Sequence, residues 1–270
     1  MAPRARQARA VTAAPSSADP YNESSARRYA AAEDRPDSFA NTLAPRILRT
    51  IEAVNDGSLR ALDVGAGTGQ LTDVLRANGV DTVAVDLALP MLQHRCERRS
   101  GAPGSAVCAD ASRLPFHGSF DLISATFNVL NHLPGQDAVR AMVHDMSRLL
   151  ASNGLLIFDI NTRLGLEQTA SLTVVQDSDD SFTHWRRRWL SRDVLRLEAS
   201  GGFLQDGTWH RYQESIDKVA LSISWLEKEL ASAGLGNISW VSNDLLTPLD
   251  EPERHPVAFA LVRPRSPSLS

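Results

Sequence analysis

Apolar residues along this chain follow two patterns that alternate with each other. In one they recur every three or four positions, which is typical of helices. In the other they form short continuous runs, which are typical of buried strands. The helical pattern covers residues 37–54, 70–77, a segment beginning at Pro90, and 136–150, and the strand pattern covers 59–64, 81–86, 105–109, 120–126 and 155–160. Strands that alternate with helices predict a doubly wound α/β fold, with a mostly parallel sheet covered by helices on both faces.

The pattern changes after Ile160. Residues 161–214 have the spacing of irregular and antiparallel strands, with turns expected at Gly201-Gly202 and Asp206-Gly207. Asn153-Gly154 is expected to end the helix before the fifth strand. A helix is then expected over 216–233, followed by two last strands at 237–241 and 257–262. An insertion of this length exceeds an ordinary connection, which indicates a functional, lid-like segment.

The chain therefore divides into five expected segments. These are a disordered tail over residues 1–20, a core over 21–160, the lid-like insertion over 161–215, completion of the core sheet over 216–263, and a tail over 264–270. The first tail is rich in Ala, Arg, Ser and Pro and lacks hydrophobic periodicity, as disordered segments do.

Composition narrows the possible functions. The chain has 270 residues, 43% of them hydrophobic, and a net charge of -4. No run of apolar residues is long enough to span a membrane, and the mild acidity gives no general attraction to nucleic acid. The basic and aromatic run from His184 to Trp189 has two interpretations, a nucleic-acid patch or a strand with Trp185, Arg187 and Trp189 on one face. We favour the strand, because no second basic cluster supports nucleic acid.

The two cysteines, Cys96 and Cys108, do not form a CxxC pair. Neither a metal site nor a disulfide framework is therefore expected. Cys108 lies in a short apolar run and is expected to be a small buried side chain. A reducing, cytoplasmic location is the simplest interpretation.

The most informative run is ALDVGAGTGQ over residues 61–70, in which a strand meets a helix through a glycine turn. Glycines such as Gly65 and Gly67 let a backbone approach a ligand closely. The dinucleotide-binding fingerprint requires glycine where Gln70 stands. Asp63 at the mouth of the turn would repel a pyrophosphate and attract an ammonium group.

This run resembles the signature of class I S-adenosylmethionine (SAM)-dependent methyltransferases, which implies a Rossmann-like fold with a seven-stranded sheet. The resemblance covers residues 29–160 well and the last two strands loosely. It implies a SAM site made from the glycine turn with Asp63, Gly65, Ala66 and Gly67, the ribose-binding Asp86, the adenine-side Leu87, Met91, Asp110 and Ala111, the methionine-side Tyr29, and Phe127 after the fourth strand. Alternatives remain open for single residues: Asp86 or Asp110 as a helix cap, and Met91 as a core residue.

The segment TFNVLNHLP over residues 126–134 follows the fourth strand, at the sheet edge where ligands bind in open α/β folds. It is similar to a segment of glycine and amino-sugar N-methyltransferases. His132 is either a general base or a histidine at a helix start that bonds to the backbone. Asn128 and Asn131 either orient a substrate or cap the turn.

The end of the insertion reads DGTWHRYQE over residues 206–214, and it resembles the last lid strand of some small-molecule methyltransferases. The resemblance implies acceptor-binding roles for Trp209, Arg211 and Glu214, although Ile216 replaces a histidine that many relatives have. On a strand, Trp209, Arg211 and Gln213 share one face, and His210, Tyr212 and Glu214 share the other. We expect one face to pack on the core and the other to meet the substrate. A surface hairpin with ordinary cross-strand pairs is the alternative.

The sequence thus predicts a SAM-dependent methyltransferase that acts on a small-molecule acceptor by N- or O-methylation, of the kind found in secondary metabolism. A non-catalytic SAM-binding protein or partner subunit is the alternative. A nicotinamide-dependent oxidoreductase is disfavoured by Gln70 and Asp63. The identity of the acceptor and the oligomeric state stay open.

Overall fold

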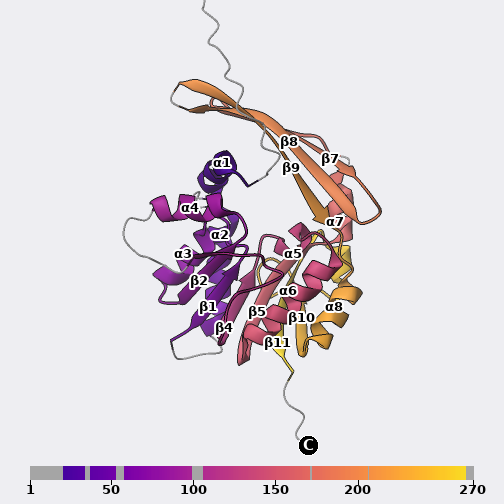
Figure 1. Ribbon diagram of the computed structural model, residues 1–270. Helices are drawn as coiled ribbons and strands as arrows, with labels where there is room; N and C mark the ends of the chain where they lie inside the picture. The colour runs from indigo at the N-terminus through magenta and orange to yellow at the C-terminus, as the bar shows by residue number, and fades with distance from the viewer. Residues whose placement is uncertain are drawn as a thin grey trace, which may run out of the picture.

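The structure is a computed structural model, and it describes residues 21–33, 37–52, 58–98, 106–170, 172–205 and 207–265. A seven-stranded sheet with the order β10-β11-β5-β4-β1-β2-β3 forms its centre (Figure 1). Its strands are β1 (Arg60–Val64), β2 (Asp81–Asp86), β3 (Ala106–Cys108), β4 (Phe120–Ala125), β5 (Leu150–Asn161), β10 (Leu235–Val241) and β11 (Val257–Pro264). The first five are parallel, and β11 runs antiparallel to both β5 and β10. The predicted mostly parallel sheet is confirmed.

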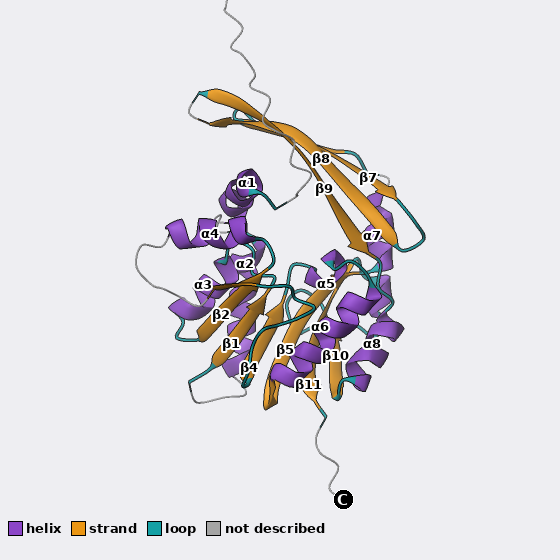
Figure 2. Ribbon diagram, viewed as in Figure 1, coloured by secondary structure: helices purple, strands orange, loops and turns teal. Residues whose placement is uncertain are grey.

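Helices cover both faces of this sheet (Figure 2). They are α1 (Glu23–Glu33), α2 (Phe39–Glu52), α3 (Gln70–Ala77), α4 (Leu89–Arg98), α5 (Val129–His132), α6 (Gln136–Leu149), α7 (Arg163–Ala170), α8 (Ile223–Ser232) and the short 3₁₀ helix η1 (Pro252–Arg254). One apolar core lies between the sheet and α6 with α8, and a second lies between the sheet and α2 with α3. Burial of apolar side chains on both faces is what a doubly wound sheet requires. Within the described residues, no helix is long and apolar enough to cross a membrane.

A second sheet is antiparallel and has the order β6-β7-β8-β9. Its strands are β6 (Val174–Asp177), β7 (Ser181–Trp189), β8 (Val194–Gln205) and β9 (Thr208–Val219). It arches over α1 and α5, above the edge where β1, β2 and β4 end (Figure 1). We call this sheet the lid. Its inner face carries Tyr212, Glu214 and Lys218, which contact α1 and the β4–α5 region. The residues of β9 that alternate with these three along the strand lie on the outer face of the lid.

Four details of the sequence prediction are wrong. The turn expected at Gly201-Gly202 is absent, because β8 runs through both glycines and pairs them with β7 and β9. The helix expected to start at residue 216 starts at Ile223, because Ile216–Val219 pairs with β8 and Ser222 caps α8 by accepting a bond from the amide of Trp225. Asn153-Gly154 does not end a helix, because β5 begins at Leu150 and runs through both residues. Cys108 is exposed, because β3 is the edge strand of the sheet. The expected tail over residues 1–20 and residues 266–270 of the second tail lie outside the described residues.

Candidate active site

The glycine turn joins β1 to α3 and is held against the end of β2. The amides of Gly65 and Ala66 both donate to the carbonyl of Val85, at 2.8 and 3.0 Å. Gly65 has a φ of +69°, and a Cβ there would lie 2.5 Å from Cγ2 of Val129. Glycine is therefore required at residue 65 by both its backbone conformation and the packing of α5.

Asp63 lies beneath the turn and not at its mouth. It is 2% exposed, and its Oδ1 and Oδ2 accept hydrogen bonds from the hydroxyls of Ser124 (2.9 Å) and Thr72 (2.6 Å). Burial raises the pKa of the Asp63 carboxyl to about 6. Its hydrogen bonds tie β1, β4 and α3 together under the turn.

Asp86 lies at the end of β2, facing the turn. Its Oδ2 accepts from the amide of Gly67 and its Oδ1 from the amide of Ala88, both at 2.8 Å. Burial raises the pKa of this carboxyl as well. Each carboxylate oxygen retains a second lone-pair direction, so Asp86 can also accept from two neighbouring hydroxyl groups of a bound ribose.

The residues expected on the adenine side gather beyond Asp86. Leu87 is 69% exposed, whereas Met91 on α4 is buried. Asp86 pairs with Cys108 in the β2–β3 register, which places Asp110 and Ala111 beside it at the same edge of the sheet. Asp110 accepts bonds from both the amide and the hydroxyl of Ser112, at 2.8 Å each. It thus caps a turn and not a helix, because no helix lies between β3 and β4, and its side chain remains exposed.

Tyr29 on α1 lies over the glycine turn. A Cβ placed on Gly67, whose φ is +57°, would lie 3.4 Å from Cε1 of Tyr29. The Tyr29 ring meets Phe127 edge to face at a centroid distance of 5.8 Å, and Phe127 meets Phe39 at 4.9 Å. Burial raises the pKa of Tyr29, so its hydroxyl stays protonated. Tyr29 and Phe127 therefore form an aromatic wall beside the turn.

The backbone after β4 is strained. Phe127 and Asn128 have φ values of +70° and +54°, which are uncommon for residues with a side chain. The buried carboxylate of Asp159 on β5 accepts the amide of Asn128, at 3.1 Å to each oxygen, and holds this conformation. Burial raises the pKa of Asp159 to about 6. Strain that neighbouring groups enforce is typical of functional sites.

His132 is hydrogen-bonded at both ring nitrogens. Its Nε2 lies 3.1 Å from Oδ1 of Asn128, and its Nδ1 lies 2.8 Å from the hydroxyl of Tyr21. Because Lys218 Nζ also donates to that Asn128 oxygen, at 2.7 Å, the oxygen is an acceptor. Nε2 of His132 then carries the proton, and Nδ1 accepts from Tyr21. Burial, with the nearby charge of Lys218, lowers the pKa of His132 to about 3.

Asn131 has a structural role. It is fully buried, and its Nδ2 donates to the carbonyls of Asn161 (3.1 Å) and Val219 (2.8 Å). Its Oδ1 accepts from the amide of Asn161 at 2.8 Å. Both amide hydrogens are used, so Asn131 joins the ends of β5 and β9 and has no donor left for a substrate.

The inner face of the lid is tied to α1. Glu214 is 7% exposed, accepts from the hydroxyl of Ser25 at 2.8 Å, and forms an ion pair with Arg28. The Arg28 guanidinium lies over the ring of Tyr212, 3.5 Å from its centroid. Of the expected acceptor-binding residues on β9, Glu214 is thus the one that faces the core.

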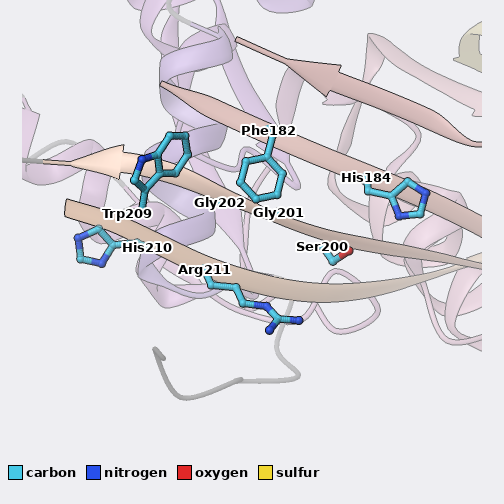
Figure 3. A pocket seen from close by; sticks show the side chains of 8 residues that line it. All are labelled: Phe182, His184, Ser200, Gly201, Gly202, Trp209, His210 and Arg211. Carbon is cyan, nitrogen blue, oxygen red and sulfur yellow. The ribbon is translucent and has the colours of Figure 1, made fainter. Parts of the chain in front are cut away.

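Trp209 and Arg211 lie on the outer face. With Phe182, His184, Ser200, Gly201, Gly202 and His210 they line a hollow of about 440 Å³ (Figure 3). Gly202 makes room for it, because a Cβ there would lie 2.8 Å from the ring of Phe182 and 3.3 Å from that of Trp209. The structure therefore does not bring Trp209 or Arg211 to the glycine turn.

Comparisons with known proteins agree with this geometry. A family model described as a methyltransferase domain matches residues 62–158. The demethylmenaquinone methyltransferase of Thermobifida fusca is 34% identical over 203 residues, which cover 71% of this chain and 75% of that protein. The chain belongs to the SAM-dependent methyltransferases. This methyltransferase is of the small-molecule type, and SAM is its cofactor.

Solved structures share the fold of the methyltransferase. A SAM-dependent methyltransferase from Clostridium acetobutylicum has a TM-score of 0.80 at 25% identity, covering 89% of this chain and 99% of its own. A sugar N-methyltransferase from Streptoalloteichus has a TM-score of 0.72 at 18% identity, covering 96% of this chain and 100% of its own. The predicted Rossmann-like methyltransferase fold is confirmed.

The site expected from the sequence does not include four residues that the structure places around it: Tyr21 before α1, Arg28 on α1, Asp159 on β5, and Lys218 on β9. A signal for Lys218 was present, because it is one of only two lysines in a chain that otherwise uses arginine. The other three act through contacts between segments far apart in the sequence, and no local pattern marks them.

Proposed function

We propose that this methyltransferase transfers the SAM methyl group to the amine nitrogen of a small molecule held between α1, α5 and the inner face of the lid. The same proposal assigns SAM to the edge formed by the glycine turn. Asp86 would bind the ribose, with Leu87, Met91, Asp110 and Ala111 around the adenine and Tyr29 and Phe127 beside the methionine part. Gly67 supports this, since its missing side chain leaves space under Tyr29 and beside Asp86.

SAM supplies a methyl group made electrophilic by its sulfonium. The protein then has to orient the acceptor and exclude water. Tyr29 and Phe127 shield the glycine turn from one side. The lid and α1, joined through Glu214, Ser25 and Arg28, cover the sheet edge from above.

The observation that carries the proposal is the state of His132. An alkyl hydroxyl needs a base as it attacks, and a useful base has a pKa near the working pH. His132 has a pKa of about 3, and its Nδ1 lone pair already accepts from Tyr21. A neutral amine attacks with its own lone pair and needs no base beforehand. The sugar N-methyltransferase with the same fold is consistent with an amine acceptor.

Pairs of acceptors that differ only in the attacking atom test the proposal. Amino sugars and cyclic amines are each compared with the hydroxyl compound of the same skeleton, by S-adenosylhomocysteine release and by product mass. We expect methylated product from the amine member of a pair and none from its hydroxyl partner. Faster transfer to the hydroxyl members would contradict N-methylation. Release that matches the acceptor-free blank across the whole panel would favour the non-catalytic alternative.

A further inference from the structure

We propose that Arg187 and Lys218, on the inner face of the lid, bind a carboxylate or phosphate group of the acceptor. This inference rests on the acceptor site proposed above and adds a charge requirement to it. It predicts an acceptor that carries an anionic group in addition to the atom that is methylated.

The strand register places the two cations on the same face. Arg187 on β7 pairs with Leu197 on β8, which pairs with Ile216 on β9. In the neighbouring row, Lys218 on β9 pairs with Leu195, which pairs with Trp189. Since directly opposed residues share a face, Arg187 and Lys218 both lie on the inner face, two strands apart with β8 between them and one row apart along the strands.

Neither cation has a carboxylate partner among the described residues. Lys218 Nζ donates to two amide oxygens, Oδ1 of Asn128 at 2.7 Å and Oδ1 of Asn161 at 2.8 Å. Among the described residues, Arg187 donates to the carbonyl of Leu172 alone, at 3.4 Å. Lysine has three donor hydrogens and arginine has five, so both retain donors for a ligand.

Several other arginines of the lid and of its neighbour α1 form ion pairs, although within the described residues the exposed Arg186 and Arg211 form none. Arg188 pairs with Glu198, Arg196 with Asp217, and Arg28 with Glu214. Two partly buried positive charges on neighbouring rows of the same face are unfavourable for the free energy of the folded protein unless a negatively charged group binds beside them. Burial lowers the pKa of Arg187, and burial followed by repulsion from Arg187 lowers the pKa of Lys218 to about 8. The buried Asp159 carboxylate attracts Lys218 more strongly than Arg187 repels it, but the described residues include no ion pair between Asp159 and Lys218, and one negative charge stands against two positive ones.

The position of Lys218 favours the acceptor over SAM as the source of the anion. Lys218 bonds to Asn128, and the same Asn128 oxygen bonds to His132 on α5. The cation is thus attached to the β4–α5 segment through Asn128, whereas the expected SAM residues other than Phe127 lie at the ends of β1, β2 and β3 and on α1 and α4. An anionic group bound here would hold the acceptor against the lid.

The test measures anion binding directly, on the full chain saturated with S-adenosylhomocysteine. Acetate and inorganic phosphate are each titrated against chloride at equal ionic strength and followed by thermal shift, for the wild type and for R187Q, K218Q and R186Q. Arg186 is the matched control, because it is the neighbouring residue on β7 and its exposed side chain lies on the outer face. We expect saturable binding of at least one anion, weakened roughly tenfold or more in R187Q and K218Q and unchanged in R186Q. Preference for acetate or for phosphate would identify the group on the acceptor.

Three results of this titration would overturn the inference. These are no saturable binding of either anion, equal weakening in R186Q, or a parallel loss of S-adenosylhomocysteine affinity in R187Q and K218Q, which would assign the cations to the cofactor. The proposed N-methylation has a separate readout. If amines without an anionic group turn over as well as amines that carry one, the anion site is contradicted, whereas the proposed N-methylation is supported.

Discussion

The hydroxyl of Tyr21 lies 2.8 Å from Nδ1 of His132. This contact joins the residues just before α1 to α5, while Ser25 and Arg28 join α1 to Glu214 of the lid. The N-terminal segment is therefore attached at two places, to α5 through Tyr21 and to the lid through Ser25 and Arg28. His132 acts within this arrangement as a bridge between Tyr21 and Asn128.

His132→Gln should lower turnover of an amine acceptor by less than about tenfold. A true proton-transfer group would contribute roughly 10²–10⁴-fold. The amide of glutamine can replace some of the bonds to Tyr21 and Asn128, so most of the arrangement should survive. Steady-state kinetics with a fixed amine acceptor provide the measurement. A loss of a hundredfold or more with unchanged S-adenosylhomocysteine affinity would restore His132 as a general base.

The same residue should make the protein sensitive to acid. His132 has a pKa of about 3 in the folded protein, against an ordinary value of 6.5. Between these pH values the unfolded chain binds a proton that the folded protein does not, so stability rises with pH by up to roughly 1.4 kcal/mol per unit. This contribution is fully present above pH 6.5 and is lost as the pH falls toward 3.

Denaturant unfolding at several pH values between 4 and 7.5 measures this slope. The raised pKa values of Asp63 and Asp159 act in the opposite direction, and they act in both proteins, so comparison of the wild type with His132→Gln isolates the histidine. The variant should lose less stability than the wild type as the pH falls. Parallel curves would show that His132 is not held neutral.

Asp86→Asn should weaken S-adenosylhomocysteine binding by roughly 10- to 100-fold, the range for lost hydrogen bonds to a charged group. Asp86 organises the amides of Gly67 and Ala88, and its remaining lone pairs are those we assign to the ribose. Asp81→Asn is the control, because Asp81 starts the same strand with its side chain exposed. Calorimetric titration should show weaker S-adenosylhomocysteine binding for Asp86→Asn than for Asp81→Asn. Equal affinities would show that Asp86 does not bind the cofactor.

Glu214→Gln should loosen α1 from the lid. The change leaves the partly buried Arg28 without its counter-charge, which is unfavourable in a low-dielectric environment. Amide hydrogen exchange of residues 23–33 should speed up, and the acceptor KM should rise more than the Kd of S-adenosylhomocysteine. Trp209→Ala and Arg211→Ala, on the outer face of the same strand, should leave both quantities near wild type. The reverse pattern would mean that the outer hollow binds the acceptor.

Much of the fold and of the cofactor edge could be predicted from local pattern. The bounds of α3 and β2 match the prediction residue for residue, because a glycine turn and an acid at a strand end mark them. The alternation of side chains along a strand also correctly assigned Trp209 and Arg211 to one face of β9 and Glu214 to the other. Which face points inward could not be predicted, because it depends on contacts with Ser25 and Arg28, nearly two hundred residues away in the sequence.

Chemical state was harder to predict than position. Asp63 was placed at the right turn, but its burial between Thr72 and Ser124 became visible only once β4 and α3 had been brought together. The neutral state of His132 likewise depends on Tyr21 and Lys218, which come from opposite ends of the chain. Such couplings between distant segments leave no periodicity in the sequence.

The most direct test of this account is whether SAM binds at the glycine turn beneath Tyr29. Calorimetric titration with S-adenosylhomocysteine compares the wild type with Gly67→Val and with Gly79→Val. Both glycines have positive φ values, +57° and +83°, so both substitutions strain the backbone, but a Cβ on Gly79 meets nothing within 4 Å. We predict that the wild type and Gly79→Val bind the ligand and that Gly67→Val, with its fold intact by circular dichroism, does not. Wild-type affinity in Gly67→Val would contradict the assignment of this edge to SAM.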